Sequence, residues 1–139
     1  MKKFLILILL LSLFLTSCYK NEPEKITIIK LAETTKSWNG DKLPNYLEGN
    51  AKVTILKITI PPNTKLETHK HLEINAGVLL KGELTVISEQ NDTLYLKAGD
   101  PIVELVNTWH YGKNEGKIPA EIIVFYAGVE GTPITIIKD

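Results

Sequence analysis

The chain has 139 residues, of which 44% are hydrophobic and 23% are charged, and this is the composition of a globular protein rather than a disordered one. Sixteen lysines balance sixteen acidic residues and there is no arginine, which argues against a nucleic-acid binder and against a bidentate clamp for phosphate. Cys18 is the single cysteine, so a disulfide scaffold is excluded.

Residues 1–17 form a predicted signal peptide. A short basic start, Met1-Lys2-Lys3, precedes an apolar run over 4–15 that reads FLILILLLSLFL. As a helix this run would extend about 18 Å, against about 30 Å for the hydrocarbon core of a membrane. The run is therefore too short to span stably and is typical of an export signal.

The sequence at the end of this signal, Leu15-Thr16-Ser17-Cys18, resembles the lipobox of bacterial lipoproteins. The resemblance implies that Cys18 is lipidated and becomes the new N-terminus, with 18–25 as lipidated cysteine and polar tether. Several acyl chains give a durable anchor, and we expect the protein in the bacterial cell envelope, on the periplasmic or the cell-surface side. Loss of Lys2 and Lys3 would leave 14 lysines against 16 acids, a net charge of −2 that again argues against nucleic acid.

From residue 26 onward the hydrophobic period is near two, which predicts short strands and no helix. The expected strands are 26–31, 53–60, 77–80, 84–88, 93–97, 102–106, 121–127 and 134–138, with a loop over 37–47. Short strands separated by turns are typical of an antiparallel sandwich or barrel. We therefore predict one all-β domain over 26–139.

The chain has only three histidines, and their spacing indicates a metal site. His69 and His71 lie two apart in a stretch expected to be extended, so their side chains share a face. His110 belongs to a different segment. Imidazole is a common ligand for divalent metals, and these three side chains together could cap one face of an ion.

The segments around these histidines resemble the two motifs of the cupin superfamily. Residues 63–82 follow G-x5-H-x-H-x3,4-E-x6-G, and residues 99–114 follow G-x5-P-x-G-x2-H-x3-N. The resemblance implies a jelly-roll barrel (a double-stranded β-helix). It also implies a divalent metal, such as Fe, Mn, Zn or Ni, held by two histidines, a glutamate and a third histidine.

The chain departs from the family pattern at several positions. Asn63 and Asn107 stand where the motifs have glycine, and asparagine is the residue that best replaces glycine at positive φ. Asn75 stands where the metal-binding glutamate is expected, and a neutral amide is a weaker ligand than a carboxylate. A fourth ligand would then be Asn75 itself or Glu73, because in a regular strand Glu73 would lie on the same face as the histidines. Otherwise the site is three neutral imidazoles plus an amide or water, and the resemblance allows this because some cupins of the thiol-dioxygenase kind use only three histidines.

Other residues near the motifs have predicted roles. Glu73 and Glu104 are the candidate general bases, and the facing of Glu104 stays open because an asparagine at position 107 can break the register of the strand. Trp109 and Tyr111 flank a ligand position and are expected to point away from the metal, while Tyr126 is expected to pack in the barrel. Asn114 is expected to hold a turn, as it does in the family.

Two functions are compatible with the residues. The first is a metal-dependent enzyme of oxygenase or isomerase type acting on a small molecule. The alternative is a non-catalytic cupin that binds a small molecule or a metal at the cell envelope. A third interpretation, in which the histidines only satisfy the core, would need no metal. By resemblance to other cupins, a homodimer is also expected.

Overall fold

The computed structural model describes residues 25–139. The predicted signal, Cys18 and all of the tether except Lys25 lie outside the described residues. The described part of the chain contains strands, turns and bends but no helix. Accordingly, no helix within 25–139 is long and apolar enough to cross a membrane.

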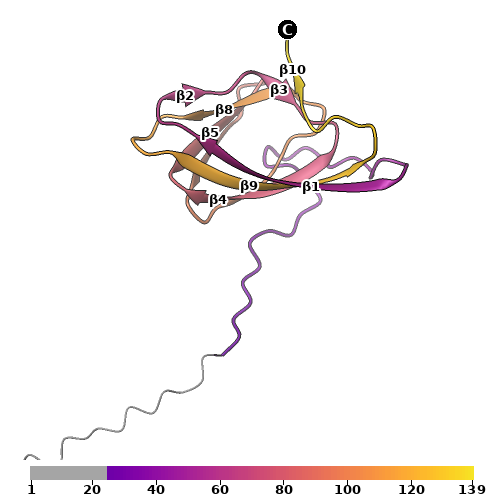
Figure 1. Ribbon diagram of the computed structural model, residues 1–139, viewed down its shortest axis with the longest axis horizontal. Coiled ribbons are helices and arrows are strands. Elements are labelled where there is room, and N and C mark those ends of the chain that lie inside the picture. Colours follow the sequence, from indigo (N-terminus) through magenta and orange to yellow (C-terminus); the bar gives the residue numbers. More distant parts are fainter. Residues whose placement is uncertain (1–24) are drawn as a thin grey trace, which may run out of the picture.

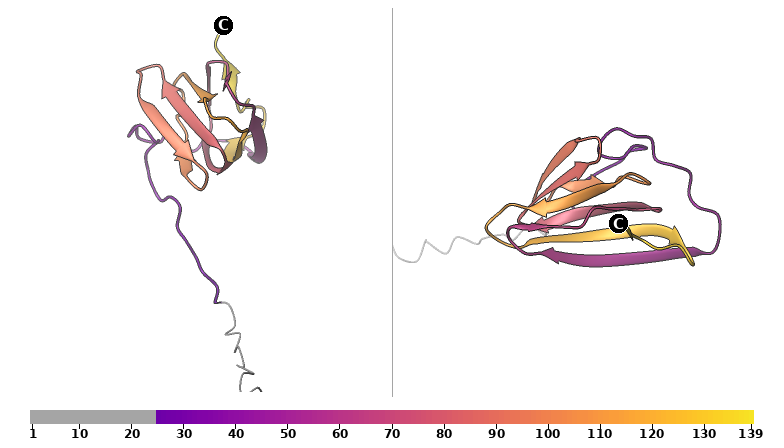
Figure 2. Two further views of the ribbon diagram at one scale, coloured as in Figure 1. Left: turned by 90° about the vertical axis from the view of Figure 1, so that its left-hand side faces the viewer. Right: turned by 90° about the horizontal axis from the view of Figure 1, so that it is seen from above.

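Two antiparallel sheets face each other and enclose the core (Figure 1, Figure 2). The first has the order β1-β9-β4-β7, with β1 (Ala51–Ile60), β9 (Ala120–Val129), β4 (Ile74–Lys81) and β7 (Pro101–Val103). The second has the order β10-β3-β8-β5-β6, with β10 (Ile136–Ile137), β3 (His69–Lys70), β8 (His110–Asn114), β5 (Glu83–Ser88) and β6 (Thr93–Lys97). The short β2 (Thr64–Lys65) also pairs with β8. This arrangement confirms the predicted all-β jelly roll.

The core lies between the sheets because the strands alternate in burial. On β9, Ala120, Ile122, Val124 and Tyr126 point inward and are almost fully buried. Leu79 and Ile102 meet them from β4 and β7. Burying such side chains contributes roughly 1.5–3 kcal/mol each to folding. The period of two in the sequence therefore reports the inner face of each sheet correctly.

Most of the predicted strands are present, but the one expected at 26–31 is wrong. That segment forms no strand, and its side chains are exposed, with Ile26 at 94% and Ile28 at 90%. It extends away from the sheets (Figure 1). A β-branched sequence favours a strand only where another strand is available to pair with it, and here the described chain offers none.

Two of the places where the chain crosses from one sheet to the other lie next to each other. Between β3 and β4 it bends at Leu72 and Glu73, and between β7 and β8 it passes through residues 104–109. The two crossings run side by side, joined by a parallel bridge between His71 and Val106. They bring the two sequence motifs together.

Asparagines support the backbone at several turns. Asn63 and Asn107 have φ of 55° and 58°, as expected for replacements of glycine. Asn114 is fully buried and donates through Nδ2 to the carbonyls of Ile60 (3.0 Å) and Ile118 (2.9 Å). Its Oδ1 accepts from the Gly116 N–H at 2.9 Å. The predicted turn-holding role of Asn114 is therefore confirmed.

Candidate metal centre

The structure brings the three histidines together between the sheets. Their ring centroids are 4.6 Å apart for His69 and His110, and 5.1 Å for each of the other two pairs. One ring nitrogen from each lies within 4.8 Å of those of the others. The first two come from β3 and the residue after it, and His110 begins β8, where it pairs with His69. The three side chains are positioned to bind a metal.

Hydrogen bonds fix which nitrogen of each ring faces the centre of the cluster. The Nδ1 of His69 contacts the carbonyl of Glu67 at 2.8 Å, and that of His71 contacts the carbonyl of Ile134 at 2.7 Å. His110 does the same with the carbonyl of Thr108 at 2.9 Å. A carbonyl can only accept, so each Nδ1 carries the proton. Each Nε2 then keeps its lone pair, which is the tautomer that ligates a metal through that nitrogen.

Burial keeps the imidazoles neutral. It lowers the pKa of His71 to about 4 and also lowers the pKa values of His69 and His110, against the opposing effect of the carbonyls that they contact. At neutral pH the Nε2 atoms are therefore already deprotonated, and no proton has to leave before an ion binds. His110 Nε2 is buried without a hydrogen-bond partner, as expected of a ligand atom.

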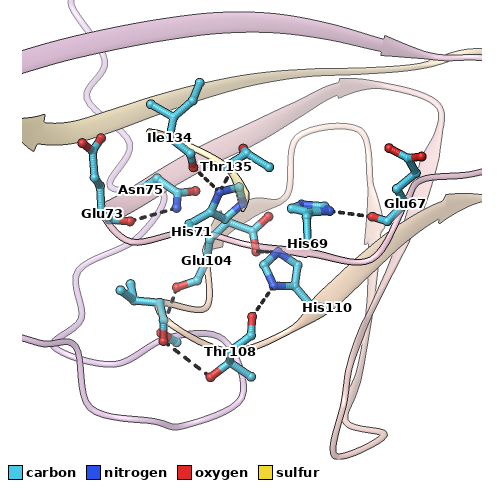
Figure 3. A network of polar contacts seen from close by, with 12 residues as sticks. Glu67, His69, His71, Glu73, Asn75, Glu104, Thr108, His110, Ile134 and Thr135 are labelled. Atoms are coloured by element: carbon cyan, nitrogen blue, oxygen red, sulfur yellow. Dashed lines mark hydrogen bonds and ion pairs between the residues drawn. The ribbon is translucent and has the colours of Figure 1, made fainter. Parts of the chain in front are cut away.

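Glu104 is the carboxylate that faces the histidines (Figure 3). Its Oε2 lies 3.7 Å from His110 Nε2, and both atoms are buried without a hydrogen-bond partner. Burial raises the pKa of Glu104 to about 7, with His69 acting in the opposite direction. Because His110 is neutral, this contact is not an ion pair.

Asn75 and Glu73 lie differently from the sequence expectation. Asn75 is buried in β4, where its Nδ2 donates to the Glu73 carbonyl at 3.2 Å and its Oδ1 has no partner. Glu73 is also buried, but it points away from the histidines (Figure 3). Its carboxylate lies against Gly128 and accepts a long hydrogen bond of 3.4 Å from the Val129 N–H. The bend at 72–73 breaks the strand alternation that would have turned Glu73 toward the cluster.

A cavity of about 130 Å³ opens onto the histidine cluster. Its polar lining consists of the three histidines with Glu104, Tyr126 and Thr135, and its apolar lining includes Leu56, Ile58, Leu66, Val86 and Val124. A water molecule in liquid takes about 30 Å³, so the space corresponds to roughly four waters. A small polar site with an apolar wall is typical of a ligand pocket.

The aromatic residues divide into two groups. Trp109 and Tyr111 do not line the cavity and lie beneath lysines instead, with Lys70 Nζ 4.8 Å and Lys65 Nζ 3.9 Å from the respective ring centroids. They point away from the cluster, as expected. Tyr126, which the sequence assigned to packing, is buried but also lines the cavity, with its ring 5.5 Å from that of His71. Tyr126 pairs with Asn75 on β4. This contact between distant parts of the sequence places the ring beside the cluster, and the sequence alone does not reveal it.

Solved structures with this fold come from several kinds of enzyme. A recombinant oxalate oxidase in complex with glycolate matches with a TM-score of 0.53 and 22% identity over 61% of this chain and 45% of its own. The DMSP lyase DddQ from Ruegeria pomeroyi DSS-3 matches with 0.55 and 17% identity over 62% and 43%. The polyketide cyclase RemF from Streptomyces resistomycificus matches with 0.54 and 14% identity over 66% and 63%. At these identities the likeness shows the fold alone.

The chain spans less than half the length of the first two structures. No curated protein matches significantly. The cupin domain family does match, over residues 56–126, which include all three histidines, Glu104 and Asn75. The strands and the site described above lie largely within this region, and on this match the chain belongs to the cupin family.

Proposed function

We propose that the protein is a metal-dependent enzyme, of oxygenase or isomerase type, acting on a small molecule. One observation carries the proposal: the three imidazoles present unprotonated Nε2 atoms to a common point at the cavity. A divalent metal held by them would supply Lewis-acid polarisation of an oxygen-bearing ligand or, if the metal is iron, binding of O2.

The residues around the cluster support this function. His69, His71 and His110 would hold the metal, and the carbonyls of Glu67, Ile134 and Thr108 keep their rings oriented. Among the residues that line the cavity, only Glu104 has a carboxylate. This side chain would therefore supply any negative charge or proton acceptor there. Of the two candidate general bases, only Glu104 therefore faces the cavity.

The size of the cavity limits the substrate. Pockets for drug-sized molecules usually have volumes of about 300–1,000 Å³, and this cavity has about 130 Å³. A substrate with only a few heavy atoms fits inside, and a larger one would place only its reacting end there. The apolar wall keeps bulk water away from that end.

Metal analysis of the full chain, purified in detergent without chelator, tests the metal site. We expect about one equivalent of a transition metal per chain in the native protein and much less in His110→Ala. Native protein that stays nearly metal-free after incubation with Fe²⁺, Mn²⁺, Zn²⁺ and Ni²⁺ would refute the proposal.

Turnover distinguishes the enzyme from the alternative, a cupin that binds a small molecule or a metal without converting it. Small diketones, thiols and sugars are suitable probes, with O2 consumption and product analysis as readouts. Conversion that requires the metal supports the enzyme. Saturable binding of a probe without conversion supports the non-catalytic alternative.

We also propose that the protein is anchored in the bacterial cell envelope through a lipid on Cys18. The charge and hydropathy of residues 1–17 and the lipobox-like sequence before Cys18 support this location. We expect the native protein in the membrane fraction, with a mass increase on the Cys18 peptide, and Cys18→Ala in a soluble fraction. An unmodified Cys18 in mature protein would refute the anchor.

A homodimer is the proposed assembly, with the outer face of β1 and β9 as its interface. Val53, Ile55 and Phe125 are exposed there at 60%, 64% and 43%. The ion pair of Lys57 with Glu121 borders this apolar patch, as polar residues border many interfaces. Sedimentation should show a dimer that Ile55→Lys dissociates, and a monomeric native protein would refute it.

A further inference from the structure

We propose that Glu104 is the fourth metal ligand of this chain, replacing the glutamate that Asn75 displaces. The inference rests on the proposed metal site and adds a ligand that the sequence motifs do not predict. Glu104 belongs to the second motif and lies in the crossing that follows β7. Asn75 belongs to the first motif and lies in β4. The carboxylate would thus be supplied by the residue that follows β7, the strand paired with β4.

The backbone places Glu104 directly beside Asn75. The pairing of β4 with β7 joins Gly77 to Ile102 and Ala76 to Val103, and the Glu104 N–H continues it by donating to the Asn75 carbonyl at 3.0 Å. Alternate residues on a strand share a face, so Ile102 and Glu104 both point inward, as their burial shows.

The predicted loop at 37–47 holds this position from the other side. The Ser37 hydroxyl donates to the Glu104 carbonyl at 2.8 Å, and the Trp38 N–H donates to the Val103 carbonyl at 2.9 Å. The backbone at Glu104 is therefore hydrogen-bonded on both sides, to β4 and to the loop at 37–47. A ligand in such a position is preorganised rather than free to swing outward.

The side-chain atoms of Glu104 and His110 indicate a cation. His110 Nε2 carries a lone pair, because its Nδ1 is the protonated nitrogen. In its ionised form Glu104 Oε2 is also an acceptor, and the two buried atoms face each other at 3.7 Å with no hydrogen bond between them. Burying two unsatisfied acceptors is costly. A metal with bonds of about 2.1 Å to nitrogen and oxygen can bridge atoms at roughly this separation.

Neither of the other two candidates has this arrangement. The Glu73 carboxylate lies against Gly128 and points away from the histidines (Figure 3). The Asn75 amide is tied through Nδ2 to the Glu73 carbonyl and carries no charge. Glu104 is the only carboxylate, among the described residues, within 4.0 Å of a ring nitrogen of the cluster.

Titration of the metal-free protein with Co²⁺, followed by its visible spectrum, tests the assignment without any substrate, because the spectrum responds to the number and type of ligands. Zn²⁺ competition then gives affinities. The variants are Glu104→Gln, the control Glu73→Gln and the positive control His110→Ala. A double variant with Glu104→Gln and Asn75→Glu returns a carboxylate at the position where the family has one.

We expect Glu104→Gln to weaken Zn²⁺ binding at least tenfold and to change the Co²⁺ spectrum, while Glu73→Gln leaves both unchanged. The double variant should regain most of the affinity. Circular dichroism and thermal unfolding of the metal-free proteins establish that each variant is folded. If Glu104→Gln binds Co²⁺ with native affinity and spectrum while His110→Ala does not, the assignment of Glu104 is overturned and the histidine site stands. If the native chain binds neither ion, the proposed metal function itself fails.

Discussion

The metal-free protein should gain stability when Glu104 is neutralised, and the gain should depend on pH. Burial raises the pKa of Glu104 in the folded state to about 7, against 4.5 for an unperturbed glutamate. Between these values the folded protein retains a proton that the unfolded chain has lost, so the free energy of unfolding falls as the pH rises from 4.5 to 7. Over this interval the free energy of unfolding falls by about 3 kcal/mol, at ~1.4 kcal/mol per pH unit.

Glutamine at position 104 has no such titration, and the comparison of the two proteins cancels the effects of the histidines to first order. We expect the stability difference between Glu104→Gln and the native protein to shift in favour of the variant by about 2.5 kcal/mol between pH 5 and pH 8. Urea unfolding with EDTA at both pH values, followed by circular dichroism, measures it. A difference that stays constant with pH, or that shifts against the variant, would refute the reasoning.

Three further substitutions test the supporting structure, each by urea unfolding of metal-free protein. Asn114→Ala should cost roughly 3 kcal/mol, because it removes three buried hydrogen bonds; a loss below about 1 kcal/mol would contradict its role. Gly128→Ala should cost about 1–3 kcal/mol, because the buried Glu73 side chain must shift to make room for the added Cβ, and combining it with Glu73→Ala should restore part of the loss. Asn107→Val should cost about 1–2 kcal/mol because φ is 58°, whereas Asn107→Gly should be nearly neutral; equal effects of the two would argue against backbone strain.

The sequence was sufficient to predict the histidine cluster and most of the strands. Both depend on local patterns: the spacing of His69 and His71 in an extended segment, and the period of two that defines the inner face of each sheet. The positive φ at Asn63 and Asn107 is expected because both stand where the motifs have glycine, and the structure confirms it.

The environments of Glu73 and Glu104 could not be predicted from the sequence, and the physical reason is the same for both. Both lie next to strand ends where the chain crosses between sheets, and the sequence does not show whether the alternation of faces continues there. The bend at Leu72 and Glu73 turns the Glu73 carboxylate away from the cluster. Glu104 faces inward because of pairing to Asn75, which is a contact between distant parts of the sequence. The failed strand at 26–31 has the same origin, since a strand requires a partner that its own sequence does not specify.

The close approach of Glu73 to Gly128 has a consequence for how this chain can change in evolution. Position 128 cannot carry even a methyl group while the Glu73 carboxylate stays in place. A smaller residue at position 73 has no steric conflict with Gly128, but it leaves a cavity because Glu73 is buried. A side chain at position 128 therefore requires that the Glu73 carboxylate move or be lost, so substitutions at the two positions should be coupled.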